Sequence, residues 1–151
     1  MTARVRPTRA AYPFLTPITT RWMDNDVYGH VNNVTYYSYF DSAANLFLVR
    51  VGGLDIHGGD VIGLVVESAC QYHAPVGYPS PLTAGVRVDR LGQRAATYGL
   101  AIFADDADAS ERDLAVAHGH VVHVFVERAS RRPVAIPAAL RAALTTIAAP
   151  A

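Results

Sequence analysis

The sequence predicts an α+β domain in which an antiparallel sheet of five strands wraps around one long helix. One helical pattern near the N-terminus is apolar on several sides, so it needs cover from several sides. One strand-like segment precedes this helix, and four more follow it with hairpin-sized connections. Consecutive hairpins favour antiparallel pairing, and a sheet with a helix across its concave face is an α+β layer architecture.

The first two elements come before residue 52. A strand is expected over residues 15–22, which are β-branched in the middle, and an acidic turn with Gly29 as its flexible point follows. The helix is expected over residues 33–51, with Asn32 or Asn33 as N-cap and the Gly52-Gly53 pair as its end. Its apolar residues recur at helical spacing: Val34, Tyr37, Phe40, Ala44, Phe47, Leu48 and Val51.

The other four strands are expected over residues 61–73, 82–90, 94–103 and 114–127. Residues 82–90 alternate cleanly, with Leu82, Ala84, Val86 and Val88 on one face. The polar stretch 104–113 is expected to be a hairpin loop. A short helix that starts at Pro137 and runs to about Thr145 closes the chain.

The composition limits the function. The chain has 151 residues, of which 51% are hydrophobic and 17% charged, with 13 basic and 13 acidic side chains. This length suits a single domain, over residues 15–151, after an arginine-rich arm over residues 1–14 that we expect to be flexible. The balanced charge argues against nucleic-acid binding, which usually needs a basic face. The small charged fraction predicts that part of the surface is buried in a homo-oligomer.

The single cysteine, Cys70, excludes an intrachain disulfide and a metal–thiolate set. It lies in an apolar segment, so we expect a packed thiol and not a nucleophile. No apolar segment approaches the roughly 20 residues of a membrane span, and no secretory core follows the N-terminal arginines. We therefore expect a cytoplasmic protein without a membrane partner; a transit peptide is the weaker alternative.

The segment RWMDNDVYGHVNNVTYYSYFD, residues 21–41, contains the candidate chemistry. It brings two aspartates and a His/Asn-rich turn to the start of the long helix. Backbone N–H groups in a first helical turn lack intrahelical partners and carry partial positive charge, so they suit a developing oxyanion. The plainer alternative is that Asp24 and Asp26 only cap the turn.

The pattern D-N-D-V-Y-G-H-V-N-N-x-x-Y-x-x-Y-F over residues 24–40 resembles the hotdog-fold thioesterases. The closest branch is the 4-hydroxybenzoyl-CoA thioesterase-like acyl-CoA thioesterases, and Q-Y-H-A-P-V (71–76) and R-P-V-A-I-P (132–137) also resemble it. The resemblance spans roughly residues 15–137. It implies a hotdog fold and cofactor-free hydrolysis of an acyl-CoA thioester to a carboxylic acid and CoA. It also implies a homodimer or homotetramer joined through sheet edges.

The same resemblance implies roles for single residues. Asp26 falls on the catalytic carboxylate, as nucleophile or as general base. Asn33 falls on the residue whose backbone amide polarises the thioester carbonyl. Arg94 and Arg90 match basic residues that contact coenzyme A, although this chain has Gly92-Gln93 where some members carry further basic residues.

Other candidates follow from the residues. His30 and Asn32 flank the expected cleft and could orient water or bind substrate, with turn and cap chemistry as the alternative. Glu67 interrupts an apolar strand, so it must face a cleft, an interface or a partner such as Arg, and could be a second acid/base. Tyr36 and Tyr37 are expected to fill core and interface, or to line the acyl pocket.

No metal site is expected. His118 and His120 share one face of a strand while His123 points to the other, and no acidic or sulfur ligand completes a set nearby.

Two other functions stay open. One is hydrolysis of acyl-carrier-protein thioesters, which would need a basic patch at the pocket mouth. The other is non-catalytic binding of acyl-CoA. A dehydratase fits poorly, because the helix interior offers Asp41 but no histidine.

Overall fold

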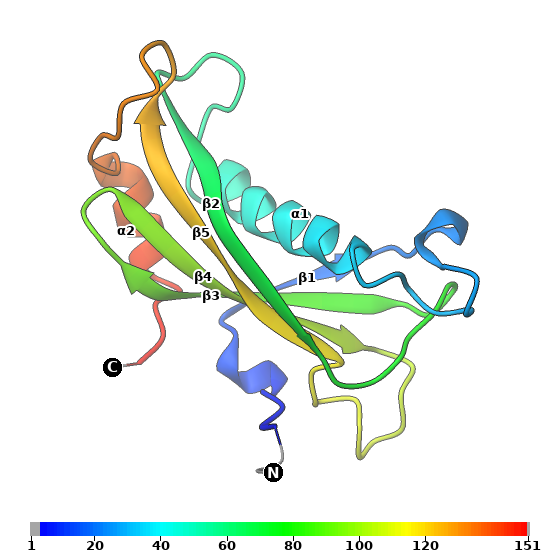
Figure 1. Cartoon of the computed structure of the whole chain (residues 1–151). Coiled ribbons are helices and arrows are strands. Elements are labelled where there is room, and N and C mark those ends of the chain that lie inside the picture. Colours follow the sequence, from blue (N-terminus) through cyan, green and yellow to red (C-terminus); the bar gives the residue numbers. More distant parts are fainter. Residues whose placement is uncertain (1–3, 151) are drawn as a thin grey trace.

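The computed structural model describes residues 4–150. The strands form one antiparallel sheet in the spatial order β1-β3-β4-β5-β2. Their bounds are β1 Phe14–Ile18, β2 Val61–Tyr72, β3 Leu82–Leu91, β4 Ala95–Ala104 and β5 Ala117–Glu127. The long helix α1, Thr35–Arg50, lies in the concave face of the curved sheet (Figure 1). This arrangement confirms the predicted α+β hotdog architecture.

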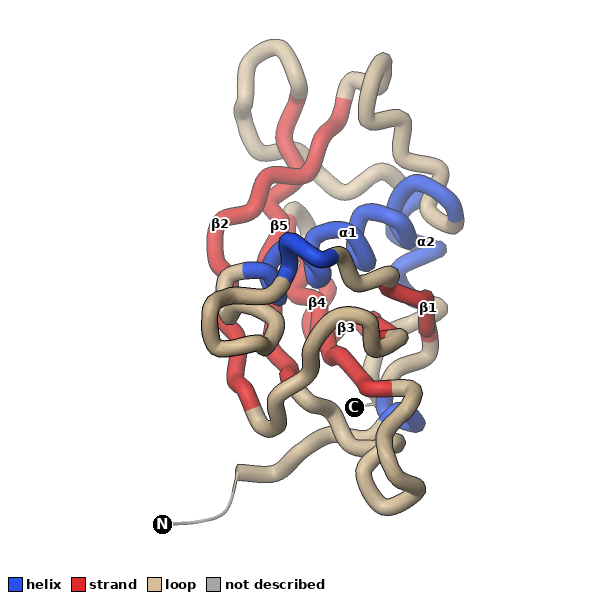
Figure 2. The backbone as a smooth tube through the Cα atoms, turned by 90° about the vertical axis from the view of Figure 1, so that its right-hand side faces the viewer, coloured by secondary structure: helices blue, strands red, loops and turns tan. Residues whose placement is uncertain are grey.

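Helix α1 is covered on several sides, as its sequence predicts. It contacts all five strands, and in the side view it lies within the hollow of the sheet (Figure 2). Its buried residues are Tyr36, Tyr39, Phe40, Ala43, Ala44, Phe47 and Leu48. The short helix α2, Ala138–Thr145, adds Leu140 and Leu144 to the same core. Burial of so many large side chains provides the main favourable term for folding.

The helix begins later than predicted. Val34 is the residue before its first turn and makes no side-chain cap. Asn32 instead forms a turn ahead of the helix, because its Oδ1 accepts the Val34 N–H at 3.2 Å. The predicted stop is confirmed: the N–H groups of Val51 and Gly52 both bond to the Phe47 carbonyl, and Gly53 has φ +69°.

Two predictions about the strands were wrong. β1 ends at Ile18, and residues 22–24 form a 3₁₀ helix, η2 (Trp22–Asp24), because the Asp24 carboxylate accepts the Arg21 N–H and closes a turn. β2 pairs with β5 and not with β3, which follows it in the chain. Consecutive hairpin pairing therefore holds only for β3, β4 and β5, and β2 forms an edge of the sheet.

The two faces of the sheet carry different residues. Toward α1, the alternating positions of β3 are buried as predicted: Leu82, Ala84, Val86 and Val88. On the outer face, Tyr12 packs with Ala101, Phe103 and Ala115 in a second apolar cluster. Gly85 allows this contact, because a Cβ there would lie 2.7 Å from the Tyr12 ring.

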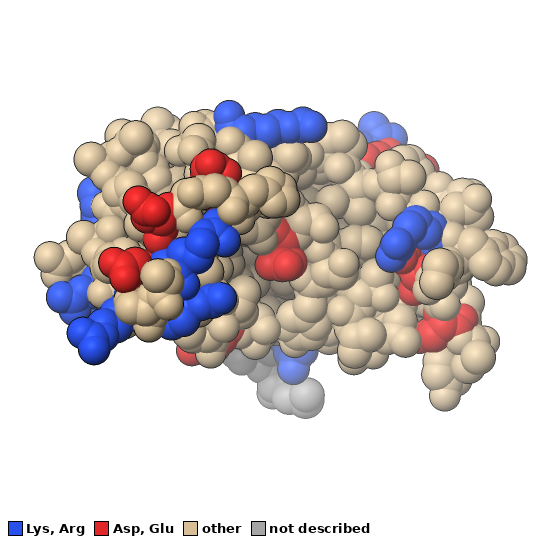
Figure 3. All heavy atoms as spheres, turned by 90° about the horizontal axis from the view of Figure 1, so that it is seen from above, with Lys and Arg blue, Asp and Glu red and all other residues tan. Residues whose placement is uncertain are grey.

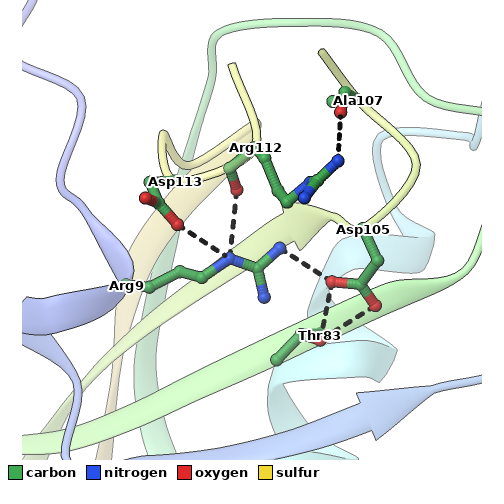
Figure 4. A network of polar contacts seen from close by, with 6 residues as sticks. All are labelled: Arg9, Thr83, Asp105, Ala107, Arg112 and Asp113. Carbon is green, nitrogen blue, oxygen red and sulfur yellow. Dashed lines mark hydrogen bonds and ion pairs between the residues drawn. The ribbon is translucent and has the colours of Figure 1, made fainter. Parts of the chain in front are cut away.

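The expected N-terminal arm contacts this outer face. The Arg6 side chain donates to the Ala115 carbonyl at 2.9 Å, and Thr8 forms a β-bridge with Leu114. Arg9 pairs with Asp105 at 2.7 Å and with Asp113 at 3.6 Å (Figure 4). Residues 6–12 of the arm are therefore held against the sheet, and residues 1–3 lie outside the described residues. Across residues 4–150, no helix has the length and apolar character needed to cross a bilayer.

Candidate active site

The two aspartates of the turn have different surroundings. Asp24 is 2% exposed and accepts hydrogen bonds from the Tyr39 hydroxyl at 2.7 Å and from the Arg21 N–H at 2.9 Å. Burial raises the pKa of Asp24, but the bonds from Tyr39 and Arg21 outweigh it and hold that pKa below its usual value. Asp24 therefore caps and anchors the turn, as the plainer alternative predicts for it.

Asp26, two residues later, lines a cavity of about 440 Å³. Its Oδ1 accepts the Tyr28 N–H at 2.9 Å, and its own N–H donates to the His30 carbonyl at 2.9 Å. Gly29 adopts φ +83°, which lets the chain reverse within this short turn. The local turn thus holds the Asp26 backbone and one carboxylate oxygen, while the carboxylate group remains at the wall of the cavity.

The cavity joins three parts of the chain. Asp26 and His30 come from the turn, and Asn33 and Tyr36 lie just before and within the first turn of α1. Tyr72 ends β2, and His73 directly follows it. The fold therefore brings together three residues predicted to be catalytic and one predicted to bind substrate. Asn32 lies beside this group, where its side chain caps the following turn.

The backbone amides at the helix start are mostly occupied. The N–H groups of Val31, Asn32, Val34 and Thr35 all have acceptors. Within the described residues, the N–H of Asn33 has none. Since Asn33 is exposed and lines the cavity that contains Asp26, its N–H is free to bind an oxygen of a ligand.

A second cavity, of about 650 Å³, contains the basic residues. Arg90 and Arg94 line it together with Glu67 and His120. The Glu67 Oε1 lies 2.7 Å from the His120 Nε2, so the partner of Glu67 is a histidine and not an arginine. The structure therefore places Glu67 in a cleft, but in a different one from Asp26.

The two neighbouring tyrosines of α1 also separate. Tyr36 is 3% exposed, lines the Asp26 cavity, and packs edge-on against Tyr72 with ring centroids 5.3 Å apart. Tyr37 lines another cavity, of about 390 Å³, beside Asp41 and Val65. Of the two tyrosines, only Tyr36 lies in the cavity that contains Asp26.

A histidine that the sequence analysis did not select also lines the Asp26 cavity. His73 Nε2 lies 2.8 Å from His118 Nδ1, and the rings are nearly parallel at 6°. Burial lowers the pKa of both residues, and for His73 the charges of His118 and Arg6 lower it further. The signal in the sequence was a histidine directly after a strand; its partner, 45 residues away, becomes apparent only in the fold.

The other two histidines of β5 lie on opposite faces of the strand, as predicted. His123 is 2% exposed, and its Nδ1 lies 3.2 Å from the Tyr98 hydroxyl, while His120 pairs with Glu67 in the second cavity. In the part of the chain that the structure covers, residues 4–150, no three His, Cys, Asp or Glu side chains gather into a metal site. Burial raises the pKa of the partly buried Cys70 to about 11, so the residue stays a thiol.

These histidines predict an acid-sensitive fold. Burial lowers the pKa of His73, His118 and His123 below the ordinary value of 6.5, so below that pH the unfolded chain binds more protons than the folded one. The free energy of unfolding should therefore fall between about pH 7 and pH 5. Urea unfolding across this range measures the slope, which should be shallower in the double variant His73→Gln/His118→Gln. An equal slope in both proteins would show that His73 and His118 do not cause the loss of stability at low pH.

Comparison with known proteins gives a consistent picture. The model of the thioesterase-like superfamily matches residues 20–144. The PA5185 protein of Pseudomonas aeruginosa strain PAO1 is similar at 54% identity, with a TM-score of 0.92, over 97% of this chain and 99% of that chain. The PA2801 protein of the same species, a proposed thioesterase, is similar at 27% identity, with a TM-score of 0.77, over 89% and 98%.

A more distant structure shares the fold. The 1,4-dihydroxy-2-naphthoyl-CoA thioesterase of Synechocystis has a TM-score of 0.75 at 17% identity, over 87% of this chain and 95% of that chain. A search of the curated proteins finds no match.

Proposed function

Because the chain belongs to the thioesterase-like superfamily and is a thioester hydrolase, we propose that it hydrolyses acyl-CoA thioesters at the Asp26 cavity. The products are a carboxylic acid and free CoA, and the reaction needs no cofactor. One observation supports this site above all others: a carboxylate and an unoccupied backbone N–H, on Asp26 and Asn33, line the same cavity.

The proposed chemistry uses these two groups in sequence. Asp26 either takes a proton from an attacking water or attacks the thioester carbon itself, giving an anhydride that water then hydrolyses. Either attack converts the carbonyl oxygen into an oxyanion, which the Asn33 N–H can stabilise. Collapse of the tetrahedral intermediate breaks the C–S bond, and the CoA thiolate leaves and takes up a proton.

The second cavity suits the nucleotide part of the substrate. Arg90 and Arg94 line it, and guanidinium groups are well matched to phosphate oxygens. His30, in the first cavity, is a candidate to orient water. We propose that the two cavities bind different parts of the same substrate. The thioester lies at the first cavity, and the arginines of the second cavity bind the phosphates of CoA.

The carrier-protein alternative has weaker support. It calls for a basic surface that attracts an acidic partner. Seen from above, basic and acidic side chains are intermixed at one end of the molecule (Figure 3).

The edge strand β2 exposes Leu64, Val65 and Val66, which supports a homodimer or a dimer of dimers formed through sheet edges.

Thiol release from a substrate panel tests the proposal. The panel contains short, medium, long and aromatic acyl-CoAs, the same acyl groups on acyl carrier protein, and the same groups on N-acetylcysteamine. We expect hydrolysis of acyl-CoA with a lower KM than for the truncated thioester. Arg94→Gln should raise KM for acyl-CoA but not for the truncated substrate. Hydrolysis of carrier-protein thioesters alone would favour an acyl-carrier-protein thioesterase. Binding of acyl-CoA without any hydrolysis would favour a non-catalytic binding protein.

A further inference from the structure

Tyr72 is the last residue of β2 and reaches across to the start of the helix. Its hydroxyl donates a hydrogen bond to the Asn33 carbonyl at 2.9 Å. Burial raises the pKa of Tyr72 well above its usual value, so the hydroxyl keeps the proton that it donates. The ring packs against Tyr36, with centroids 5.3 Å apart. A rigid strand end thus holds a backbone carbonyl at the wall of the Asp26 cavity.

This bond completes the support of two consecutive peptide groups. In the peptide that joins Asn33 to Val34, Tyr72 holds the carbonyl and Asn32 Oδ1 accepts the N–H at 3.2 Å. In the preceding peptide, the Asn32 carbonyl accepts the Thr35 N–H at 2.9 Å, and the Asn33 N–H has no acceptor within residues 4–150. With both peptide planes held, the backbone of Asn33 keeps one orientation, and so does its free N–H.

We propose that Tyr72 is a positioning residue for thioester hydrolysis, which fixes the Asn33 peptide so that its free N–H meets the developing oxyanion. This inference rests on the proposed function, because it assigns the Asn33 N–H a role in the reaction. Tyr72 acts through the backbone and not on the reacting atoms. Donors that are fixed before the reaction stabilise a transition state without any cost of reorganisation during it.

Tyr72→Phe removes the bond and keeps the ring. With the best substrate of the panel, kcat should fall by about 10- to 100-fold, because small displacements of a catalytic group have effects of this size. KM should stay within about twofold, since an oxyanion contact forms only in the transition state. Tyr78→Phe is the matched control: Tyr78 is 41% exposed against 40% for Tyr72, and should keep the wild-type rate. The thermal midpoint should match that of the wild type in both.

A second variant tests the shared mechanism. Asn32→Ala removes the other support of the same peptide, so the double variant with Tyr72→Phe should lose less than the product of the two single losses. Multiplicative losses, an unchanged kcat in Tyr72→Phe, or a rise in KM alone would each overturn the inference. A Tyr72→Phe enzyme with full activity beside an inactive Asp26→Asn enzyme would reject this role and leave the proposed function standing. Wild-type protein without hydrolysis would instead reject the proposed function.

Discussion

Asp26→Asn is expected to lower kcat for thioester hydrolysis by about 10²–10⁴-fold, because the amide can neither attack the carbonyl nor accept a proton from water. The fold should persist, since the amide oxygen can still accept the Tyr28 N–H that Asp26 Oδ1 accepts at 2.9 Å. Thiol release with saturating acyl-CoA measures the loss, and the far-ultraviolet circular dichroism spectrum checks the fold.

Asp55 provides a matched control for this substitution. Its Oδ1 accepts the N–H of His57, two residues ahead, at 3.1 Å, as Asp26 Oδ1 does with Tyr28. Asp55 lines a different cavity, so Asp55→Asn should keep the wild-type kcat. An Asp26→Asn enzyme that is as active as Asp55→Asn would reject the assignment of Asp26. The next candidate would then be Glu67, beside His120.

Asp24→Ala is expected to destabilise the protein by about 3 kcal/mol, because it removes the acceptor of a buried hydroxyl and of a backbone N–H. The Tyr39 hydroxyl and the Arg21 N–H lose the bonds that they donate at 2.7 and 2.9 Å. Urea unfolding at neutral pH measures the change in the free energy of unfolding.

The exposed Asp106, in the loop between β4 and β5, is the control for this loss. Asp106→Ala should change the free energy of unfolding by less than about 0.5 kcal/mol, the usual range for surface positions. If Asp24→Ala cost no more than this control, Asp24 would not anchor the turn. Asp24→Ala and Asp26→Asn together separate stability from catalysis: the first should lower the free energy of unfolding and the second should lower kcat, although the two aspartates are only two positions apart.

Local patterns in the sequence predicted much of the fold. The helical spacing of apolar residues predicted α1 and its burial, and the alternation in residues 82–90 predicted the buried face of β3. The motif over residues 24–40 predicted the superfamily and indicated Asp26 and Asn33 as neighbours at the start of a helix. Such features are recoverable because periodicity and short motifs depend on residues that are close along the chain.

The site itself depends on contacts between distant residues. Asp24 and Asp26 look alike in the sequence, but packing buries the first against Tyr39 and leaves the second at a cavity. Likewise, Glu67 meets His120 and not Asp26. The contact of Glu67 with His120 follows from strand order, because β2 pairs with β5. The burial of Asp24 follows instead from the packing of η2 against α1, where Tyr39 donates to its carboxylate. Burial and partner choice are properties of the packed chain, and no short segment contains them.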